Sequence, residues 1–340
     1  MTGHTGFKGS WLALWLKELG AEVGGYALLP DKAINHYDLL GLQMHSVEGD
    51  VKDNAKLMQF FADFRPEIVF HLAAQPLVRY SYREPVATFE TNVMGTVNVL
   101  EACRQTPSVR AIVNITSDKC YENREWVWGY RENDPMGGYD PYSASKGAAE
   151  IVTAAYRRSF FNNADYGKTH YTLLASCRSG NVIGGGDWSD DRLIPDIVRA
   201  VEAGSTAEIR SPNATRPWQH VLDALSGYLL LGQRLLEGET LYADAWNFGP
   251  ADEDTLCVGE MCALFKAEWD AARIDMSETP PKLHEAGLLK LDCSKAHTML
   301  GWKGKWSGRE AVALTAQWYR EYLENGKIMS KEQLKKWMDR

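Results

Sequence analysis

Helix-length and strand-length stretches alternate along the first half of this chain. Apolar residues recur with helical spacing in some stretches and form short, nearly continuous runs in others, as buried strands do. The expected helices are 10–19, 52–64, 86–103 and 142–161, and the expected strands are 21–29, 68–72, 111–116 and 171–176. Because strands that alternate with helices pair in parallel, this order predicts a doubly wound α/β fold with helices on both faces of one sheet.

The later part of the chain has shorter elements that are interrupted by glycine and proline. The breaks lie at 184–187, 211–213 and 279–281. This change predicts two lobes, a larger one formed by 1–178 and 216–250 and a smaller α/β lobe formed by 179–215 and 251–340. The lysine-rich end of the chain, 327–340, is expected to form a solvated helix.

Composition argues against several classes of protein. The 340 residues carry 45 acidic and 37 basic side chains, a formal charge of -8, whereas a nucleic-acid surface needs a basic face, so no nucleic-acid partner is expected. No apolar run reaches the length of about 18 residues that a membrane span requires, so no membrane partner is expected either. The six cysteines are scattered without a CxxC pair or zinc-type spacing, which indicates reduced thiols in a cytoplasmic protein and no metal site.

A glycine-rich motif opens the chain. Its three glycines are spaced three residues apart in Thr2-Gly3-His4-Thr5-Gly6-Phe7-Lys8-Gly9, directly before an expected helix. Such glycines let a pyrophosphate lie against the backbone N–H groups at a helix N-terminus. The residues expected to bind a dinucleotide cofactor in this motif are Gly3, Thr5, Gly6, Phe7 and Gly9.

Two later strand ends carry residues suited to the same cofactor. One offers an acid and an amide to an adenine, and the other offers small residues that let a cofactor pass close to the backbone. These residues are Asp50, Val51, Leu72, Ala73 and Ala74. The acid that often binds the adenine ribose about 20 residues after the glycine motif is replaced here by Tyr26-Ala27-Leu28, so this position leaves NAD and NADP both open.

A strand normally leads into a glycine motif of this kind, but only Met1 and Thr2 precede it here. We therefore expect the first strand of the sheet to be absent from this chain and the coding region to start roughly 10 to 20 residues upstream. Because that strand would be central in the sheet, this form of the chain is expected to fold poorly and to bind NAD weakly.

Tyr142 and Lys146 carry the strongest chemical signal. Residues four apart on a helix share one face, so the ammonium group can lower the pKa of the phenol. A tyrosine tuned in this way can exchange a proton with an alcohol while hydride moves to a nicotinamide. The spacing is common by chance, but its place one strand and one loop after Ile115-Thr116-Ser117 favours a catalytic role over a structural one.

The glycine motif, His71-Leu72-Ala73-Ala74, Ser117 and the Tyr142/Lys146 pair together resemble the extended short-chain dehydrogenase/reductase family. The resemblance implies a Rossmann-type fold that uses NAD, and it reaches from Thr2 to about Trp318. The segments TGHTGFKGSWL, TSDKCY, RSGNVIGGGDW and RPWQHV are similar to the sugar-nucleotide 4,6-dehydratases of this family, in particular to the branch that acts on CDP-glucose.

The resemblance implies a three-step reaction on CDP-glucose as substrate. Tyr142, aided by Lys146 and Ser117, would take the proton of the sugar 4-hydroxyl, and water would then leave across carbons 5 and 6. Asp118 would protonate the leaving hydroxide and Lys119 would remove the carbon 5 proton; in the dTDP-glucose branch this pair is Asp-Glu. A surface ion pair at a strand end is the structural alternative for Asp118 and Lys119.

The expected substrate residues follow the later strands. Arg178-Ser179-Gly180-Asn181 ends one strand, and the planar fork of arginine suits the oxygens of a diphosphate. Arg192 and Arg216 are therefore our candidates for the nucleotide diphosphate, with Asn181 as a hydrogen-bond donor to the same group or to the sugar. The resemblance alone implies three further properties. The base would be cytosine, and the protein would form a homodimer through the helices 86–103 and 142–161. The product would serve the synthesis of deoxysugars of bacterial surface polysaccharides such as the O-antigen of lipopolysaccharide.

Two other functions stay open from the sequence. A different nucleotide-sugar enzyme of the same family, such as a dTDP-glucose dehydratase or a dTDP- or UDP-sugar 4-epimerase, is the nearest, although an epimerase has no need of the Asp118/Lys119 pair. A catalytically inert, nucleotide-binding regulatory protein on the same fold is the other, and the retention of Ser117, Tyr142 and Lys146 argues against it.

Overall fold

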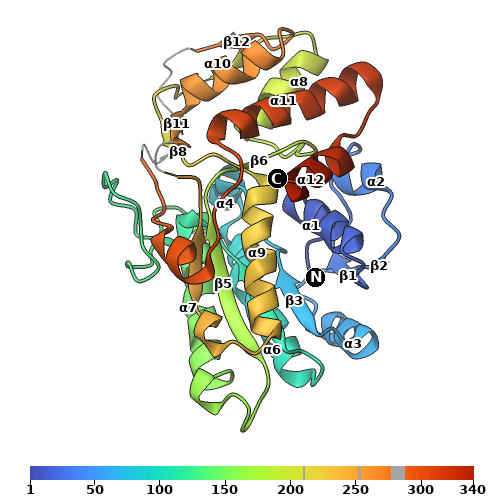
Figure 1. The fold of residues 1–340 in the computed structure, drawn as a ribbon, viewed down its shortest axis with the longest axis vertical. Coiled ribbons are helices and arrows are strands. Elements are labelled where there is room, and N and C mark those ends of the chain that lie inside the picture. The colour runs from blue at the N-terminus through green and yellow to red at the C-terminus, as the bar shows by residue number, and fades with distance from the viewer. Residues whose placement is uncertain (210, 252–253, 277–287) are drawn as a thin grey trace.

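A computed structural model describes residues 1–209, 211–251, 254–276 and 288–340 (Figure 1). The centre of the fold is a parallel sheet whose strands are β1 (Gly24–Ala27), β2 (His45–Glu48), β3 (Ile68–His71), β4 (Ala111–Ile115), β5 (Leu173–Ser179) and β10 (Ala245–Phe248). Four of them follow the order β10-β5-β4-β3, and β1 pairs with β2 alongside. The expected doubly wound α/β fold is confirmed, with most strands shorter than predicted.

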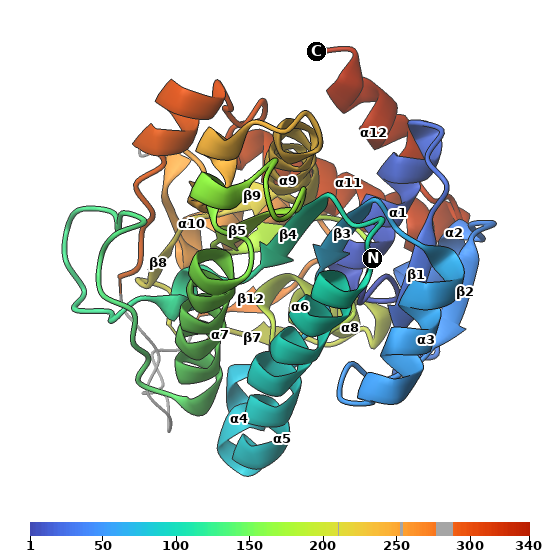
Figure 2. The same ribbon diagram turned by 90° about the horizontal axis from the view of Figure 1, so that it is seen from below.

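Helices cover both faces of this sheet (Figure 2). On one face lie α1 (Phe7–Glu18) and α9 (Val221–Leu236), packed with Ala111, Val113 and Ile115 of β4. On the other face lie α3 (Asn54–Phe64), α6 (Gly95–Gln105) and α7 (Pro141–Ser159), packed with Ile112 and Leu174. Alternate residues of β4 thus enter two different cores, because successive side chains of a strand point to opposite faces.

Met1 and Thr2 occupy the place between β1 and β3. The Thr2 N–H donates to the carbonyl of Phe70 at 3.0 Å, and the Tyr26 N–H donates to the carbonyl of Met1 at 3.0 Å. Thr2 is bridged in parallel to both Tyr26 and His71. These two residues therefore join the two parts of the sheet at the position where a first strand is expected. The poor folding and weak NAD binding expected of this chain stay predictions.

The expected helix 86–103 is interrupted. It consists of α5 (Pro85–Phe89), a π-helical turn at Glu90–Met94, and α6, and it is preceded by α4 (Val78–Arg83). The π turn carries Asn92, whose amide donates to Ser145 of α7 at 2.8 Å. Helix α7 starts with Pro141 in its first turn and is capped by Asp140, which accepts from the Ser143 N–H at 2.9 Å.

Shorter elements gather beyond one end of the sheet, at the top of Figure 1. They are the pairs β6 (Val182–Ile183) with β9 (Gln219–His220), β7 (Ala207–Glu208) with β12 (Ile274–Asp275), and β8 (Thr215–Arg216) with β11 (Leu256–Cys257), and the helices α8 (Leu193–Glu202), α10 (Val258–Glu268) and α11 (Gly308–Asn325). The lobe boundaries at 178, 215 and 250 stay predictions, and the predicted break at 279–281 lies outside the described residues.

The last helix, α12 (Ser330–Met338), is solvated on one face only. Leu334 and Trp337 are buried, and the Trp337 ring lies 4.8 Å from that of Trp15 on α1. Lys331, Lys335 and Lys336 face the solvent. The expected terminal helix is present with its lysines in solvent, and two apolar residues three apart give it in addition one buried apolar face.

The described residues hold six cysteines as thiols. In the same part of the chain no helix combines the length and the hydropathy of a transmembrane segment. Nor do any three His, Cys, Asp or Glu side chains of the described ranges come together as metal ligands.

Candidate active site

One large cavity, of about 1200 Å³, opens at the carboxyl ends of the parallel strands. Its lining comes from the glycine motif, from the residues that follow β1 to β5, and from the segments 179–196 and 208–218. Ligands of doubly wound folds bind at this edge of the sheet, because the loops that leave the strands form a crevice there.

Two features of its geometry suit the glycine motif to a ligand whose oxygens accept from backbone N–H groups. Gly3 has a φ of +72°, and a Cβ there would lie 2.7 Å from the backbone nitrogen of Ala73. A Cβ on Gly9 would lie 2.0 Å from the carbonyl oxygen of Gly3. The close turn brings α1 toward the cavity, and its N-cap Gly6 supplies no side chain to cap the helix, so the first-turn amides stay open to an anion.

The other predicted cofactor residues line the same cavity, namely Thr5, Phe7, Asp50, Val51, Leu72, Ala73 and Ala74. The Thr5 hydroxyl donates to the Leu28 carbonyl at 2.9 Å, and one Asp50 carboxylate oxygen accepts from the Lys52 N–H at 2.9 Å. Leu28 and Asp31 also line the cavity, so β1 does offer an acid, four residues beyond its last residue, Ala27. The binding roles of these residues stay predictions.

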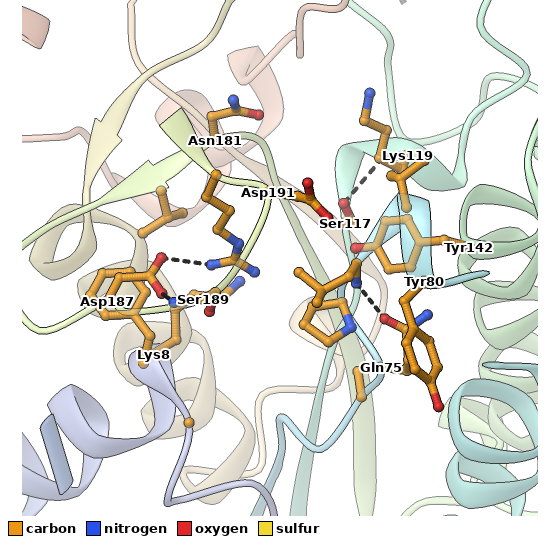
Figure 3. A pocket seen from close by; sticks show the side chains of 18 of the residues that line it. Lys8, Gln75, Tyr80, Ser117, Lys119, Tyr142, Asn181, Asp187, Ser189 and Asp191 are labelled. Atoms are coloured by element: carbon orange, nitrogen blue, oxygen red, sulfur yellow. Dashed lines mark hydrogen bonds and ion pairs between the residues drawn. The ribbon is translucent and has the colours of Figure 1, made fainter. Parts of the chain in front are cut away.

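All five predicted catalytic residues line the cavity, and we call four of them the inner wall: Ser117, Asp118, Tyr142 and Lys146. Figure 3 shows Ser117 near the phenol of Tyr142. Ser117 follows β4, while Tyr142 and Lys146 are 8% and 6% exposed in the first two turns of α7. Burial raises the pKa of Tyr142 to about 12, against a hydrogen bond with Ser117 and the charge of Arg192, which act to lower it. The depressed pKa expected for this phenol is therefore wrong for the site as described, because burial outweighs the nearby positive charge.

Lys146 and Asp118 are both shifted toward their neutral forms. Burial lowers the pKa of Lys146 to about 8, although the charge of Glu150 acts to raise it. Burial also raises the pKa of Asp118, which is 2% exposed, against the charge of Lys119 and a hydrogen bond from Ser117. Among the described residues the Oδ2 atom of Asp118 has no hydrogen-bond partner, while Oδ1 accepts from Ser117 at 3.0 Å. Asp118 is thus suited to donate a proton.

Lys119 lines the cavity next to Asp118. Its backbone N–H donates to the Ser117 hydroxyl at 3.3 Å. In Figure 3 its side chain extends away from the phenol of Tyr142.

The opposite side of the cavity, which we call the outer wall, is the loop 187–192. Here Arg192 donates to the buried Asp187 at 2.8 Å, and its side chain is 34% exposed. Two further ion pairs connect the loop to the segment after β1 and to α4: Lys32 with Asp190 at 2.7 Å and Arg79 with Asp191 at 3.0 Å. The outer wall is held mainly by charges that are partly exposed to water.

The remaining substrate candidates divide into two groups. Asn181 and Arg216 line the cavity, and the charge of Arg216 is among those that lower the pKa of Asp118. Arg178 does not: its guanidinium is buried behind the site and pairs with Glu150 at 2.8 Å. Its place beside Ser179 at a strand end suggested the substrate side, but side chains of a strand alternate, and Arg178 points away from the cavity.

Sequence reasoning missed two charged residues near the site. Lys8 lines the cavity. Its pKa is lowered to about 8, mainly by burial and in addition by the positive charges of Lys146 and Arg192. Its position within the glycine motif was a signal that could have identified it. Glu150 lies one turn beyond Lys146 on α7. The only signal for it in the sequence was its spacing of eight residues from Tyr142, which places both on the same helix face.

Comparison with known proteins gives a family and a fold. The chain matches the family described as GDP-mannose 4,6 dehydratase over residues 1–315. It is 52% identical to the CDP-glucose 4,6-dehydratase of Salmonella typhimurium, over 99% of this chain and 95% of that protein. Among solved structures, the UDP-glucose 4-epimerase of Thermus thermophilus in complex with NAD superposes with a TM-score of 0.80 at 24% identity, covering 94% of this chain and 97% of that one. The dTDP-glucose 4,6-dehydratase of Streptomyces venezuelae with NAD bound gives a TM-score of 0.76 at 22% identity, covering 94% and 96%.

Proposed function

The chain belongs to the GDP-mannose 4,6 dehydratase family, and from that premise we propose that it converts CDP-glucose to CDP-4-keto-6-deoxyglucose and water with NAD as cofactor. The observation that carries this function is the 52% identity to a CDP-glucose 4,6-dehydratase over 99% of the chain. The inner wall supports it, since one cavity brings together an alcohol-oxidising pair and an acid/base pair.

The site fits a dinucleotide on the geometry of the glycine motif. Gly3 and Gly9 stand where any Cβ would collide with backbone, and the uncapped start of α1 offers its amides to a pyrophosphate. NAD bound there would supply a hydride acceptor for carbon 4 of the sugar and, once reduced, a hydride donor for carbon 6, with no net change over one turnover.

Tyr142 handles the proton of the sugar 4-hydroxyl. Its phenol has a pKa raised to about 12 and is therefore protonated at neutral pH in the site as described. Lys146, on the same helix face, and the Ser117 hydroxyl supply the positive charge and the hydrogen bond that a phenolate needs. Once deprotonated, Tyr142 accepts the proton as carbon 4 becomes a ketone. Because the product keeps this ketone, the proton then passes to solvent and does not return to the sugar.

Asp118 and Lys119 carry the elimination. The carbon 4 ketone acidifies the carbon 5 proton, which Lys119 removes as the carbon–oxygen bond at carbon 6 breaks. Asp118 protonates the departing hydroxide, so that one water leaves. Lys119 returns its proton to carbon 5 as carbon 6 receives the hydride, and Asp118 regains a proton from solvent. The raised pKa of Asp118 and the unpartnered Oδ2 atom, in the described part of the chain, support its role as the acid.

Arg192, Arg216 and Asn181 hold the rest of the substrate. Arg192 and Arg216 offer planar guanidinium groups to the diphosphate, and Asn181 offers an amide to the same group or to the sugar. Arg192 is already positioned by Asp187, which leaves the remaining donors of its fork for the ligand.

The assembly, location and role in the cell follow as further parts of the proposal. Apolar side chains exposed along α5, the π turn and α7 suit a homodimer interface: Val86, Phe89, Met94 and Ile151 are 69%, 39%, 51% and 61% exposed. The six thiols suit the reducing cytoplasm. The product would serve the synthesis of deoxysugars for surface polysaccharides such as the O-antigen of lipopolysaccharide.

Incubation with CDP-glucose or dTDP-glucose in the presence of added NAD, followed by mass spectrometry, tests the proposal. Loss of one water from the CDP sugar alone is the expected result. Loss of water from the dTDP sugar instead would identify a different dehydratase, and an isomeric hexose of unchanged mass would identify a 4-epimerase. Recovery of both sugars unaltered would indicate an inert nucleotide-binding protein.

A further inference from the structure

A buried charge network lies directly behind the inner wall. Glu150 and Arg178 are each 4% exposed, and one oxygen of Glu150, Oε2, pairs with the Arg178 guanidinium at 2.8 Å. The same oxygen accepts from the Ser176 hydroxyl at 2.8 Å, and the other oxygen, Oε1, accepts from the Thr116 hydroxyl. Both oxygens of the buried carboxylate are therefore bonded, as a charge in the interior requires.

This network joins the two segments that carry the proposed catalytic residues to strand β5. Glu150 belongs to α7 with Tyr142 and Lys146, and Thr116 directly precedes Ser117 and Asp118. Arg178 extends the network by donating to the Tyr121 hydroxyl at 2.7 Å, and Tyr121 directly follows the turn of Asp118 and Lys119. The Tyr121 hydroxyl in turn donates to Asn247 of β10 at 2.8 Å.

Glu150 lies four residues after Lys146 on α7, so the two share a helix face, and its charge is the largest that acts on Lys146. Glu150 and the Cys120 thiol act to raise the pKa of Lys146 against burial, and Lys8 of α1 and His71 of β3 lie within electrostatic reach. The groups that face Glu150 itself are Arg178 and Cys177 of β5, Cys120, and Arg157 of α7. Burial alone would raise the pKa of Glu150, but the charge and hydrogen bond of Arg178 and the hydrogen bonds of Thr116 and Ser176 hold it below its ordinary value.

We propose that Glu150 is a positioning residue of the reaction, whose carboxylate keeps Lys146 charged and, through Arg178 and Thr116, fixes α7 against the ends of β4 and β5. The proposal rests on the proposed function, because it assigns Lys146 a role only while it is an ammonium beside Tyr142. A purely structural pair is the competing explanation, since buried ion pairs can be replaced by apolar residues without loss of stability.

The direct test is a substrate-free titration. In enzyme labelled with carbon-13 at the lysine ε-carbons, the Lys146 signal is the one that Lys146→Arg removes. In Glu150→Gln this signal should titrate about one to three pH units lower than in the wild type, because an opposing charge is gone and Arg178 is left unbalanced. Asp244→Asn is the matched control: it removes a carboxylate that pairs with Arg157 of the same helix at 3.6 Å, and it should leave the Lys146 titration unchanged.

A double variant keeps the test valid if Glu150→Gln folds poorly. Glu150→Gln/Arg178→Met removes both charges, so no unpaired ion stays buried, and thermal melting reports whether the fold recovers. We expect its Lys146 signal to titrate between those of the wild type and Glu150→Gln. A wild-type titration in the double variant would overturn the proposal, and so would a Glu150→Gln protein that melts early but titrates normally.

The catalytic readout separates this inference from the proposed function. If the wild type dehydrates CDP-glucose, the alkaline limb of its kcat profile should move to lower pH in Glu150→Gln by the same shift as the Lys146 signal. An unchanged limb would refute a positioning role while the proposed function stands. If the wild type dehydrates no sugar, the proposed function fails, yet the lysine titration still decides whether Glu150 keeps Lys146 charged.

Discussion

The two walls are built in different ways, although they line one cavity (Figure 3). On the inner wall Asp118, Tyr142 and Lys146 are 2%, 8% and 6% exposed. On the outer wall the side chains of Arg192, Asp190 and Asp191 are 34%, 55% and 36% exposed. The inner wall stands on a sheet strand and a long helix, and the outer wall is a loop.

This difference separates chemistry from binding. The inner wall is backed by the buried Glu150–Arg178 network, so its groups are placed before the substrate arrives. The ion pairs of the outer wall are partly exposed, and such pairs contribute only about 0 to 1 kcal/mol each. The outer wall can therefore exchange its own ion pairs for contacts with a diphosphate at little cost. Changes in the inner wall should lower kcat, and changes in the outer wall should raise KM.

Tyr142→Phe is expected to have the largest effect. The variant keeps the ring and its packing but has no oxygen to accept the 4-hydroxyl proton, so kcat should fall about 1000-fold. The melting temperature should stay close to that of the wild type. Initial rates of CDP-glucose consumption measure the change, with Tyr171→Phe as the control because Tyr171 is 65% exposed and lies outside the cavity lining. Near-normal turnover in Tyr142→Phe would remove the inner wall from the chemistry.

Lys119→Met should lower the dehydration rate about 100-fold and abolish exchange of the carbon 5 proton with deuterated solvent. Asp118→Asn should lower the rate to a similar degree but keep that exchange, because only the acid is lost. Mass spectrometry of recovered sugar measures the exchange, and Lys331→Met, on the solvated face of α12, is the control. Exchange at the normal rate in Lys119→Met would rule out the lysine as the base.

Arg192→Lys tests the outer wall. The lysine keeps the charge but loses the planar fork, so KM for CDP-glucose should rise about tenfold while kcat changes much less. Arg104→Lys is a matched control, because Arg104 forms an exposed ion pair with Glu101 on α6 and does not line the cavity. A fall in kcat at constant KM would place Arg192 in the chemistry and blur the distinction between the two walls.

Asp191→Asn should have the smallest effect. It removes the Arg79–Asp191 ion pair at 3.0 Å, which bridges the cavity but is exposed on both sides. Stability should change by no more than about 0.5 kcal/mol, and KM should change less than in Arg192→Lys. Thermal melting and steady-state kinetics at low and high salt check both. A loss of activity as large as that of Tyr142→Phe would show the outer wall to be as strictly organised as the inner one.

The sequence predicts the fold well because hydrophobic periodicity records burial. The alternation of helices and strands and the two covered faces of the sheet follow from it directly. What periodicity does not record is local backbone geometry, so the π turn within 86–103 is invisible to it. The apolar side of α12 was missed because only Leu334 and Trp337 form it.

The site could be predicted in part. The structure brings Ser117, Asp118, Lys119, Tyr142, Lys146, Asn181, Arg192 and Arg216 to one cavity, as their motifs indicate. The roles of Arg178 and Glu150 were harder to predict, because their ion pair joins a strand and a helix at positions 28 residues apart in the chain. The raised pKa of Tyr142 could not be predicted from the sequence either, because it results from burial, which the spacing of Tyr142 and Lys146 does not reveal.

Transfer of an isotopic label tests the central claim most directly. CDP-glucose carrying deuterium at carbon 4 is incubated with the wild-type protein and NAD, and the position of the label in the product is read by NMR. The account predicts a product lighter by one water, with the deuterium at carbon 6 in its new methyl group. A product that has lost water but carries no deuterium at carbon 6, or a sugar of unchanged mass, would contradict it.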